Sequence, residues 1–157
     1  MEMPLQTIDA YFTAFVERDF NKMKSFYHQE VSYFDPLCGY LNGLQVVSMF
    51  EVIYGCLNDF KLEKTAVRDQ GDGYFIIDFI VFYTSLKTGN KIALNIKAFL
   101  KLEDQKITEQ SHGYSLHNLF KQEYGFAGWL LGWNRFYQNR IKIQTRKKIL
   151  NSIIPLK

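Results

Sequence analysis

The sequence predicts an α+β domain in which three N-terminal helices cover one face of a curved antiparallel sheet, followed by a C-terminal helical extension. The chain has 157 residues, 47% of them apolar and 17% aromatic, which suits one domain with one sizeable core. Apolar residues recur at helical spacing up to about residue 57, interrupted by one strand-like segment. From residue 60 to 115 the pattern is that of strands, and helical spacing then returns. We therefore divide the chain into a domain at 1–115 and an extension at 116–157.

The N-terminal helices are predicted from apolar spacing and capping residues. Pro4 suits the first turn of a helix, whose apolar side carries Leu5, Ile8, Phe12 and Phe15. Asp19 is typical of the N-cap of a second, short helix with Phe26 and Tyr27 inward. After a loop at 36–42, we expect Asn42 to cap a third helix, which runs to about Leu57.

The strands are predicted from alternation and from the turns between them. The segment 31–35 is one expected strand, and 61–68, 74–86, 92–102 and 107–115 are the others. In the strand 92–102, one face carries Ile92, Leu94, Ile96, Ala98, Leu100 and Leu102. In the last strand, one face carries Thr108, Gln110, His112 and Tyr114.

The segment Tyr33-Phe34-Asp35-Pro36 places a carboxylate within an apolar, aromatic strand. Val31, Tyr33 and Asp35 share one face of an extended chain, and Pro36 favours that extended conformation. Burial disfavours the ionised form of a carboxylate and makes it a stronger base. Alternatively, Asp35 caps the turn at Leu37–Gly39 by accepting backbone N–H groups. The sequence leaves both interpretations open.

Charge is distributed unevenly along the chain. Residues 1–115 contain 11 Lys and Arg against 15 Asp and Glu, whereas residues 116–157 contain 8 against 1. In the extension, Trp129, Trp133 and Phe136 lie at helical spacing among basic residues. This segment either docks on the acidic domain, as a lid or dimer arm, or lies on an anionic membrane surface. We favour docking, because short helices need packing to persist. We expect no nucleic-acid partner, because no reading motif accompanies the basic residues.

The two cysteines, Cys38 and Cys56, show no metal-ligand spacing and form no disulfide framework. We therefore expect no metal and no cofactor. The N-terminus lacks a basic region followed by an apolar one, and no apolar run approaches the ~20 residues that span a bilayer. These features predict a cytoplasmic protein.

The order of elements and one local motif resemble the nuclear transport factor 2-like superfamily, in its ketosteroid isomerase-like and polyketide cyclase-like (SnoaL-like) branches. The motif is Glu30-Val31-Ser32-Tyr33-Phe34-Asp35-Pro36, with Ala10-Tyr11 before it and Gly39 after it. The resemblance covers about residues 5–115, and the segment 125–133 resembles an extension found in many uncharacterised members. It implies a cone-shaped barrel with a pocket between helices and sheet, and a homodimer formed through the outer sheet face.

The resemblance also implies roles for particular residues. In ketosteroid isomerases the aspartate before proline moves a proton beside a carbonyl, which corresponds to Asp35, and a first-helix tyrosine that holds the developing oxyanion corresponds to Tyr11. An ungapped alignment puts Lys97 where that family has a protonated carboxylic acid. Lys97 would either stabilise an enolate or pair with Asp35. Because Lys97 and the last strand depart from the family pattern, steroid isomerase activity is not implied.

Together these arguments predict one site that binds a small apolar or aromatic ligand. The predicted catalytic residues are Asp35, Tyr11 and His112, and the predicted binding residues are Tyr33, Lys97, Gln110 and Tyr114. Asp35 would act as general base in an isomerase, cyclase or hydrolase-like reaction. The alternative is a non-catalytic module that binds an apolar ligand. For Tyr33, Tyr114 and His112, a purely structural role in the core is the competing interpretation.

Overall fold

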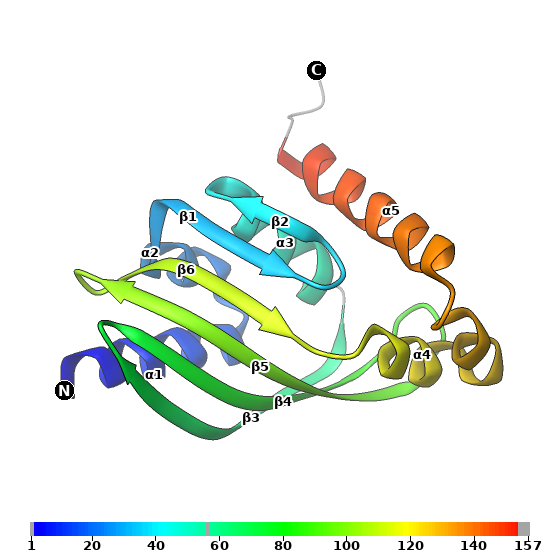
Figure 1. Cartoon of the computed structure of the whole chain (residues 1–157), viewed down its shortest axis with the longest axis horizontal. Helices are drawn as coiled ribbons and strands as arrows, with labels where there is room; N and C mark the ends of the chain where they lie inside the picture. Colours follow the sequence, from blue (N-terminus) through cyan, green and yellow to red (C-terminus); the bar gives the residue numbers. More distant parts are fainter. Residues whose placement is uncertain (1, 56, 154–157) are drawn as a thin grey trace.

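The fold is built from six strands and five helices in the described residues, 2–55 and 57–153 of a computed structural model (Figure 1). The helices are α1 (Glu2–Glu17), α2 (Phe20–Phe26), α3 (Leu44–Tyr54), α4 (Leu116–Leu131) and α5 (Arg135–Ile153). The strands are β1 (Tyr27–Asp35), β2 (Gly39–Asn42), β3 (Asn58–Gly71), β4 (Tyr74–Thr84), β5 (Lys91–Glu103) and β6 (Lys106–Gly113). Cys56, one of the two cysteines considered above, lies outside the described residues.

The strands form one curved sheet in the order β2-β1-β6-β5-β4-β3, open between β2 and β3. The predicted α+β class is confirmed, but the sheet is not wholly antiparallel, because β1 runs parallel to β6 (Figure 1). The tight turn after Asp35 brings the chain back as β2 on one edge of β1, so the other edge is left for β6. Most of the domain separates β1 from β6 along the chain. The connection is therefore long enough for the two strands to pair in either the parallel or the antiparallel direction.

The short strand β2 was predicted to be a loop. Its four residues are too few to show an alternation pattern in the sequence. The N-cap of α3 was also predicted wrongly. Gly43, with φ 47°, occupies the cap position, whereas Asn42 ends β2 and its backbone N–H donates to the side chain of Gln45. Asp19, in contrast, caps α2 as predicted and accepts the N–H of Lys22.

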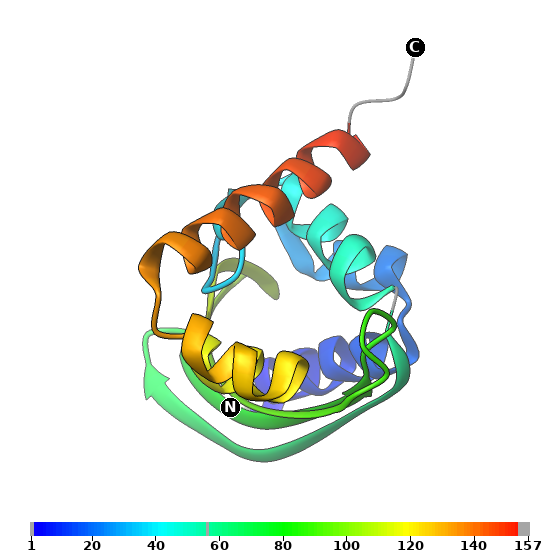
Figure 2. The ribbon, with the colours of Figure 1, turned by 90° about the vertical axis from the view of Figure 1, so that its right-hand side faces the viewer.

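The core lies between the sheet and the helices α1 and α3. The six alternating apolar residues predicted for the inner face of β5 are all buried, which confirms that prediction. Aromatic rings pack edge-on within this core: the ring of Phe12 on α1 lies 5.2 Å from that of Phe79 on β4, and the ring of Phe15 lies 5.2 Å from that of Phe50 on α3. Each such buried side chain contributes roughly 1.5–3 kcal/mol to folding. Viewed from the end, helices and sheet surround this common core (Figure 2).

The extension folds into two helices, and the first of them, α4, is kinked. Gly125 interrupts α4 with φ 60°, a backbone conformation that glycine adopts readily. The helical spacing of Trp129, Trp133 and Phe136 does not correspond to one helix, because α4 ends at Leu131 and α5 begins at Arg135. The side chain of Asn134 accepts the N–H groups of Phe136 and Tyr137, so it caps a new helix at this point.

Helix α5 lies along α3 and closes one side of the molecule (Figure 2). Its inward side carries Tyr137, Ile141 and Ile149, of which Ile149 is completely buried. The guanidinium of Arg146 donates to the backbone carbonyl of Cys38, in the turn that follows β1, and to that of Tyr40 in β2. The extension is thereby joined to the segment that carries Asp35.

The aromatic residues predicted to dock are not the ones that do. Trp129, Trp133 and Phe136 have exposed fractions of 42%, 71% and 89%. Trp129 lies in α4, Trp133 lies in the loop between the two helices with its ring 4.6 Å from that of His117, and the inward side of α5 begins at Tyr137. No helix among the described residues has the length and apolar character needed to cross a membrane.

Candidate functional site

Asp35, the last residue of β1, lies in the interior with an exposed fraction of 2%. Its Oδ1 accepts the backbone N–H of Leu37 at 2.8 Å and the hydroxyl of Tyr114 at 2.7 Å. Burial raises the pKa of the nearby Cys38 thiol, and the charge of Asp35 adds to this effect. Both interpretations of the sequence therefore hold together: Asp35 caps the turn, and it also points into the apolar interior.

His112 faces Asp35 from the neighbouring strand β6. Its Nδ1 lies 3.7 Å from Oδ2 of Asp35 and 2.9 Å from the hydroxyl of Tyr33. The parallel pairing of β1 with β6 sets this geometry, since the last paired positions, Phe34 and Ser111, directly precede Asp35 and His112. The alternation of the two strands then turns both side chains to the same inner face.

A chain of buried hydrogen bonds extends from His112 to the first helix. The side-chain amide nitrogen of Gln110 lies 2.9 Å from Nε2 of His112. The Gln110 carbonyl oxygen accepts the hydroxyl of Tyr27 at 2.8 Å, and the hydroxyls of Tyr27 and Tyr11 are 2.8 Å apart. We call the connected side chains the polar chain; its members are Tyr11, Tyr27, Gln110, His112, Tyr33, Asp35 and Tyr114.

Tyr27 is the member of the polar chain that the sequence analysis missed. It was placed on the second helix, whereas it is the first residue of β1. The alternation of side chains in a strand could have identified it, because residue 27 is separated from Val31, Tyr33 and Asp35 by an even number of positions. Extending the strand backwards by four residues would have placed Tyr27 on the inner face.

The tyrosines of the polar chain remain protonated at neutral pH. Desolvation raises the pKa of Tyr11 to about 12, against a usual value of 10.0. Burial raises the pKa of Tyr27, Tyr33 and Tyr114 well above that value, and the charge of Asp35 adds to the effect at Tyr33 and Tyr114. Their hydroxyls therefore serve as hydrogen-bond donors, whereas Asp35 supplies a carboxylate among them.

The prediction that Lys97 lies in this site is wrong. Its side chain is 52% exposed on the outer face of β5, 4.0 Å from the carboxylate of Asp78. Strand alternation explains the difference, because Lys97 lies between the buried residues Ile96 and Ala98 and must point the other way. The ungapped alignment therefore assigned the role of the family's carboxylic acid to a residue that lies on the outer face of the sheet.

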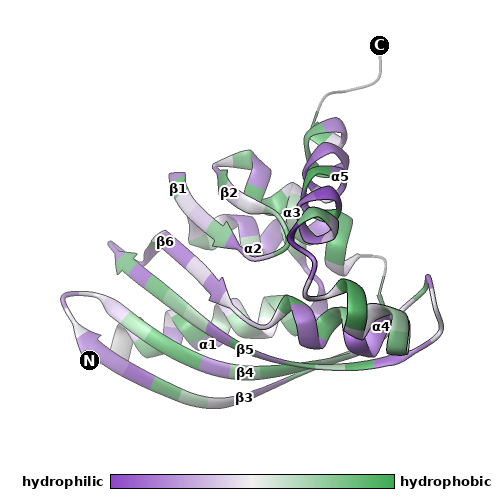
Figure 3. Cartoon of the chain, turned by 45° about the vertical axis from the view of Figure 1, so that its right-hand side comes forward, coloured by the Kyte–Doolittle hydropathy of each residue, from purple (hydrophilic) through white to green (hydrophobic). Residues whose placement is uncertain are grey.

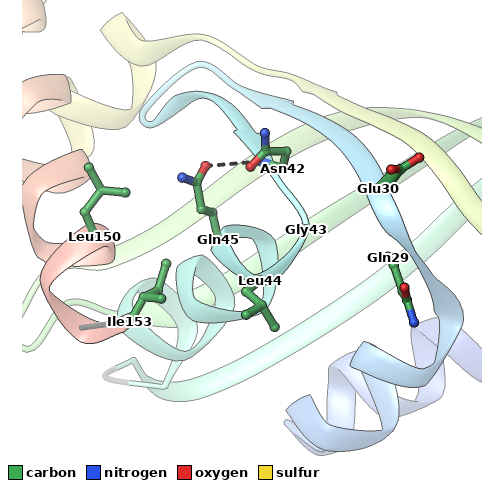
Figure 4. Close-up of a pocket in the computed structure, with 8 residues that line it drawn as sticks. All are labelled: Gln29, Glu30, Asn42, Gly43, Leu44, Gln45, Leu150 and Ile153. Atoms are coloured by element: carbon green, nitrogen blue, oxygen red, sulfur yellow. Dashed lines mark hydrogen bonds between the residues drawn. The ribbon is translucent and has the colours of Figure 1, made fainter. Parts of the chain in front are cut away.

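Side chains fill the interior around the polar chain. Tyr33 and His112 have exposed fractions of 0% and 2%, and Tyr54 and Cys38 are buried nearby. A surface depression of about 670 Å³ lies elsewhere, between the start of α3 and the end of α5 (Figure 4). Its lining contains no residue of the polar chain; it consists of Gln29, Glu30, Asn42, Gly43, Leu44, Gln45, Leu150 and Ile153. The described residues hold no group of three or more His, Cys, Asp or Glu side chains that suits a metal ion.

The polar chain combines groups used in proton transfer. A buried carboxylate can accept a proton, and the hydroxyls of Tyr33 and Tyr114 can donate hydrogen bonds to a developing negative charge. The imidazole of His112 can act in either direction. The same arrangement also satisfies every one of these polar groups within the core, which a purely structural network requires.

Solved structures share this fold at low sequence identity. An NTF2-like protein of unknown function from Burkholderia pseudomallei superposes with a TM-score of 0.71 at 14% identity, covering 80% of this chain and 100% of that one. TerC co-crystallised with polyporic acid gives 0.68 at 20% identity, covering 77% and 98%. An LEH-like epoxide hydrolase from M. tuberculosis gives 0.65 at 12% identity, covering 82% and 93%.

The sequence itself provides the family assignment. No curated protein matches the chain in a sequence search. The family profile of the SnoaL-like domain, however, matches residues 8–110, which span all the strands except the last three residues of β6. The chain therefore belongs to the SnoaL-like domain family, and its fold is that of NTF2-like proteins.

Proposed function

We propose that the chain is a small-molecule enzyme of the isomerase, cyclase or hydrolase type, in which Asp35 is the general base. The observation that carries this proposal is the buried carboxylate of Asp35, which faces the imidazole of His112 at 3.7 Å and accepts the hydroxyl of Tyr114. Similar folds in TerC co-crystallised with polyporic acid and in an LEH-like epoxide hydrolase support binding of a small organic molecule.

In the proposed reaction, Asp35 removes a proton from a carbon beside a carbonyl, or from a water molecule. Protonated tyrosines and His112 then hold the negative charge that develops on oxygen. The ligand is apolar or aromatic, because apolar and aromatic side chains surround the carboxylate. It reaches Asp35 by displacing side chains between α5 and the turn after β1, where Arg146 joins the two segments.

Deuterium incorporation tests this proposal without knowledge of the natural substrate. The protein is incubated in D₂O with a panel of small aromatic ketones, and exchange beside the carbonyl is followed by NMR; a matched panel of epoxides tests water activation. We expect Asp35→Asn to slow exchange by about 10²–10⁴-fold. Lys97→Gln is the control, since this residue lies outside the site, and its rate should equal that of the wild type. Equal rates for the wild type and Asp35→Asn exclude Asp35 as the base.

A non-catalytic binding module is the second candidate function. It is favoured by the two donors that already bind Oδ1 of Asp35, the N–H of Leu37 and the hydroxyl of Tyr114. Native mass spectrometry distinguishes the two functions. A bound small molecule that co-purifies and stays chemically unchanged supports the module, provided that Asp35→Asn retains it.

We also propose a homodimer formed through the outer face of the sheet. This face exposes Tyr40, Tyr74 and Phe99, with exposed fractions of 72%, 41% and 44%, around a depression of about 330 Å³. Aromatic side chains are enriched at protein interfaces. Sedimentation velocity tests the proposal: the double variant Tyr40→Glu/Phe99→Glu should be monomeric at concentrations where the wild type is dimeric. A monomeric wild type contradicts the proposal.

A further inference from the structure

The extension presents an apolar surface that no described part of the chain covers. Its exposed aromatic residues come from the end of α4, the loop that follows it and the start of α5; Phe126 and Trp133 have exposed fractions of 75% and 71%, and Phe136 is 89% exposed. We call this surface, together with the outward side of α5, the aromatic-basic face; it comprises Phe126, Trp129, Leu130, Trp133, Arg135, Phe136, Arg140, Ile143 and Lys147. Exposed aromatic patches of this kind mark interaction sites.

Helix α5 carries apolar residues on two sides, and those on one of these sides stay exposed. The inward side packs through Tyr137, Ile141 and Ile149. The outward side carries Phe136, Arg140, Ile143 and Lys147 in succession, at intervals of four, three and four residues, so these four side chains project in the same direction. Apolar and polar positions accordingly alternate along the helix (Figure 3). Packing against the core explains the apolar residues of the inward side. The exposed apolar residues of the outward side have no such partner within the described residues.

The charge of α5 indicates the chemistry of that partner. The helix contains six basic residues and no acidic one, in the sequence RFYQNRIKIQTRKKILNSI. None of the ion pairs among the described residues involves these basic side chains. The single acidic residue of α4, Glu123, is engaged by the hydroxyls of Ser85 and Thr88. The partner should therefore be anionic as well as apolar.

We infer that the aromatic-basic face binds the surface of an anionic membrane. Tryptophan and phenylalanine insert at the boundary between headgroups and acyl chains, and neighbouring Lys and Arg side chains attract anionic headgroups. A second copy of the chain fits less well, since a two-fold contact would place two equally basic helices against each other. This inference uses residues outside the polar chain, so it stands or falls independently of the proposed enzyme activity.

Intrinsic fluorescence gives a direct measurement, because Trp129 and Trp133 are the only tryptophans of the chain. Their emission is recorded with vesicles of phosphatidylcholine, with and without phosphatidylserine, and co-sedimentation is measured in parallel. With phosphatidylserine we expect a blue shift and sedimentation at low salt. Both should weaken when added salt shortens the Debye length to about 3 Å, at roughly 1 M. Phosphatidylcholine alone should give much weaker binding.

Paired variants separate the two contributions to binding. Phe136→Ser/Ile143→Ser removes apolar contacts, and its matched control, Leu5→Ser/Val16→Ser, removes two exposed apolar side chains from α1 (40% and 45% exposed). Arg140→Gln/Lys147→Gln removes two charges, and its control, Lys61→Gln/Lys91→Gln, changes the net charge equally on exposed strand positions. Each charge removed from the face should weaken vesicle binding about fivefold. The controls should bind as the wild type does.

Three results would overturn the inference. The first is no blue shift and no sedimentation with phosphatidylserine vesicles at low salt. The second is an equal loss of binding in the face variants and their controls, with all variants folded by circular dichroism, since that would show attraction by net charge alone. The third is a blue shift with single-stranded RNA and none with vesicles, which would assign the face to nucleic acid through base stacking.

Discussion

The imidazole Nδ1 of His112 lies 3.7 Å from the carboxylate Oδ2 of Asp35, and both side chains are buried. The two residues come from strands that run in parallel, and each has a further partner: the hydroxyl of Tyr33 for His112 and that of Tyr114 for Asp35. A buried carboxylate beside a titratable ring is a costly arrangement unless its hydrogen bonds are satisfied. Substitutions in this arrangement should therefore change both the free energy of unfolding and the protonation of its side chains.

Replacing Asp35 should separate its structural role from its charge. Asp35→Asn retains an acceptor oxygen for the N–H of Leu37 and the hydroxyl of Tyr114, so the free energy of unfolding should change by less than about 1 kcal/mol. Asp35→Ala leaves both donors buried without a partner and should cost about 1–3 kcal/mol for each. Urea unfolding at neutral pH measures both, with the exposed Glu17→Ala as control. If Asp35→Ala is as stable as the wild type, the hydrogen bonds described for this carboxylate contribute nothing to stability.

Gln110 should determine which nitrogen of His112 carries the proton. Its amide nitrogen donates to Nε2, so the neutral ring holds its proton on Nδ1, directed at Tyr33 and Asp35. Gln110→Leu removes this donor and also leaves the hydroxyl of Tyr27 without its acceptor. We expect a loss of about 1–3 kcal/mol in stability and a shift of the His112 tautomer.

Nitrogen-15 NMR of the imidazole reads this tautomer directly. The wild type should show a protonated Nδ1, and Gln110→Leu should show a mixture or the opposite form. The exposed His28 serves as an internal reference, because it lies outside the polar chain. A wild-type spectrum with the proton on Nε2 contradicts the assignment.

The buried tyrosines should make the protein sensitive to alkali. The pKa of Tyr11 is raised from 10.0 to about 12, so above pH 10 the unfolded chain loses this proton while the folded chain keeps it. The unfolded state is then favoured, and stability that is complete below pH 10 falls as pH rises towards 12. For Tyr11 alone the loss is about 2–3 kcal/mol. Unfolding measured from pH 9 to pH 12 should show a shallower decline in Tyr11→Phe than in the wild type; parallel declines would mean that Tyr11 ionises equally in both states.

The packing of the extension can be tested on one helix. Ile149 is completely buried, and Ile149→Ala should cost about 2–5 kcal/mol because it leaves a cavity. Ile143 on the same helix is 57% exposed, and Ile143→Ala should change stability by less than about 0.5 kcal/mol. Thermal or urea unfolding of the two variants gives the comparison. Similar stabilities would show that α5 does not pack as described.

The alternation of side chains within strands predicts which residues of the candidate site face inward. It does not predict which strands, far apart in the sequence, pair with each other. Tyr33, Asp35, Gln110 and His112 were placed on inner faces because side chains alternate within each strand, and the structure brings all four together. Alternation says nothing about which strands are neighbours, so the parallel pairing of β1 with β6 was not foreseen. The prediction for Lys97 failed for a different reason. Alignment with the family placed Lys97 in the site, although the alternation of side chains in its own strand placed it on the outer face.

The extension was harder to predict because its pattern has two apolar sides. Trp129, Trp133 and Phe136 recur at helical spacing, which indicates a helical face but not whether that face meets the domain or the surroundings. Asn134 was the signal that the helix restarts, since asparagine is a preferred N-cap. A helix boundary predicted at Asn134 would have assigned Trp129 to α4 and Phe136 to α5.

The parallel pairing of β1 with β6 has a consequence for the synthesis of the protein. Tyr33 and His112, which bond at 2.9 Å, are separated by 79 positions in the chain. A ribosome that has released β1 must still make β2, α3 and β3–β5 before the neighbour of β1 emerges. Until then, the β1 edge that β6 will cover and the carboxylate of Asp35 lack their final partners, and contacts of such long range fold slowly. The site should therefore be among the last parts to assemble, and nascent chains that end before β6 should depend on chaperones.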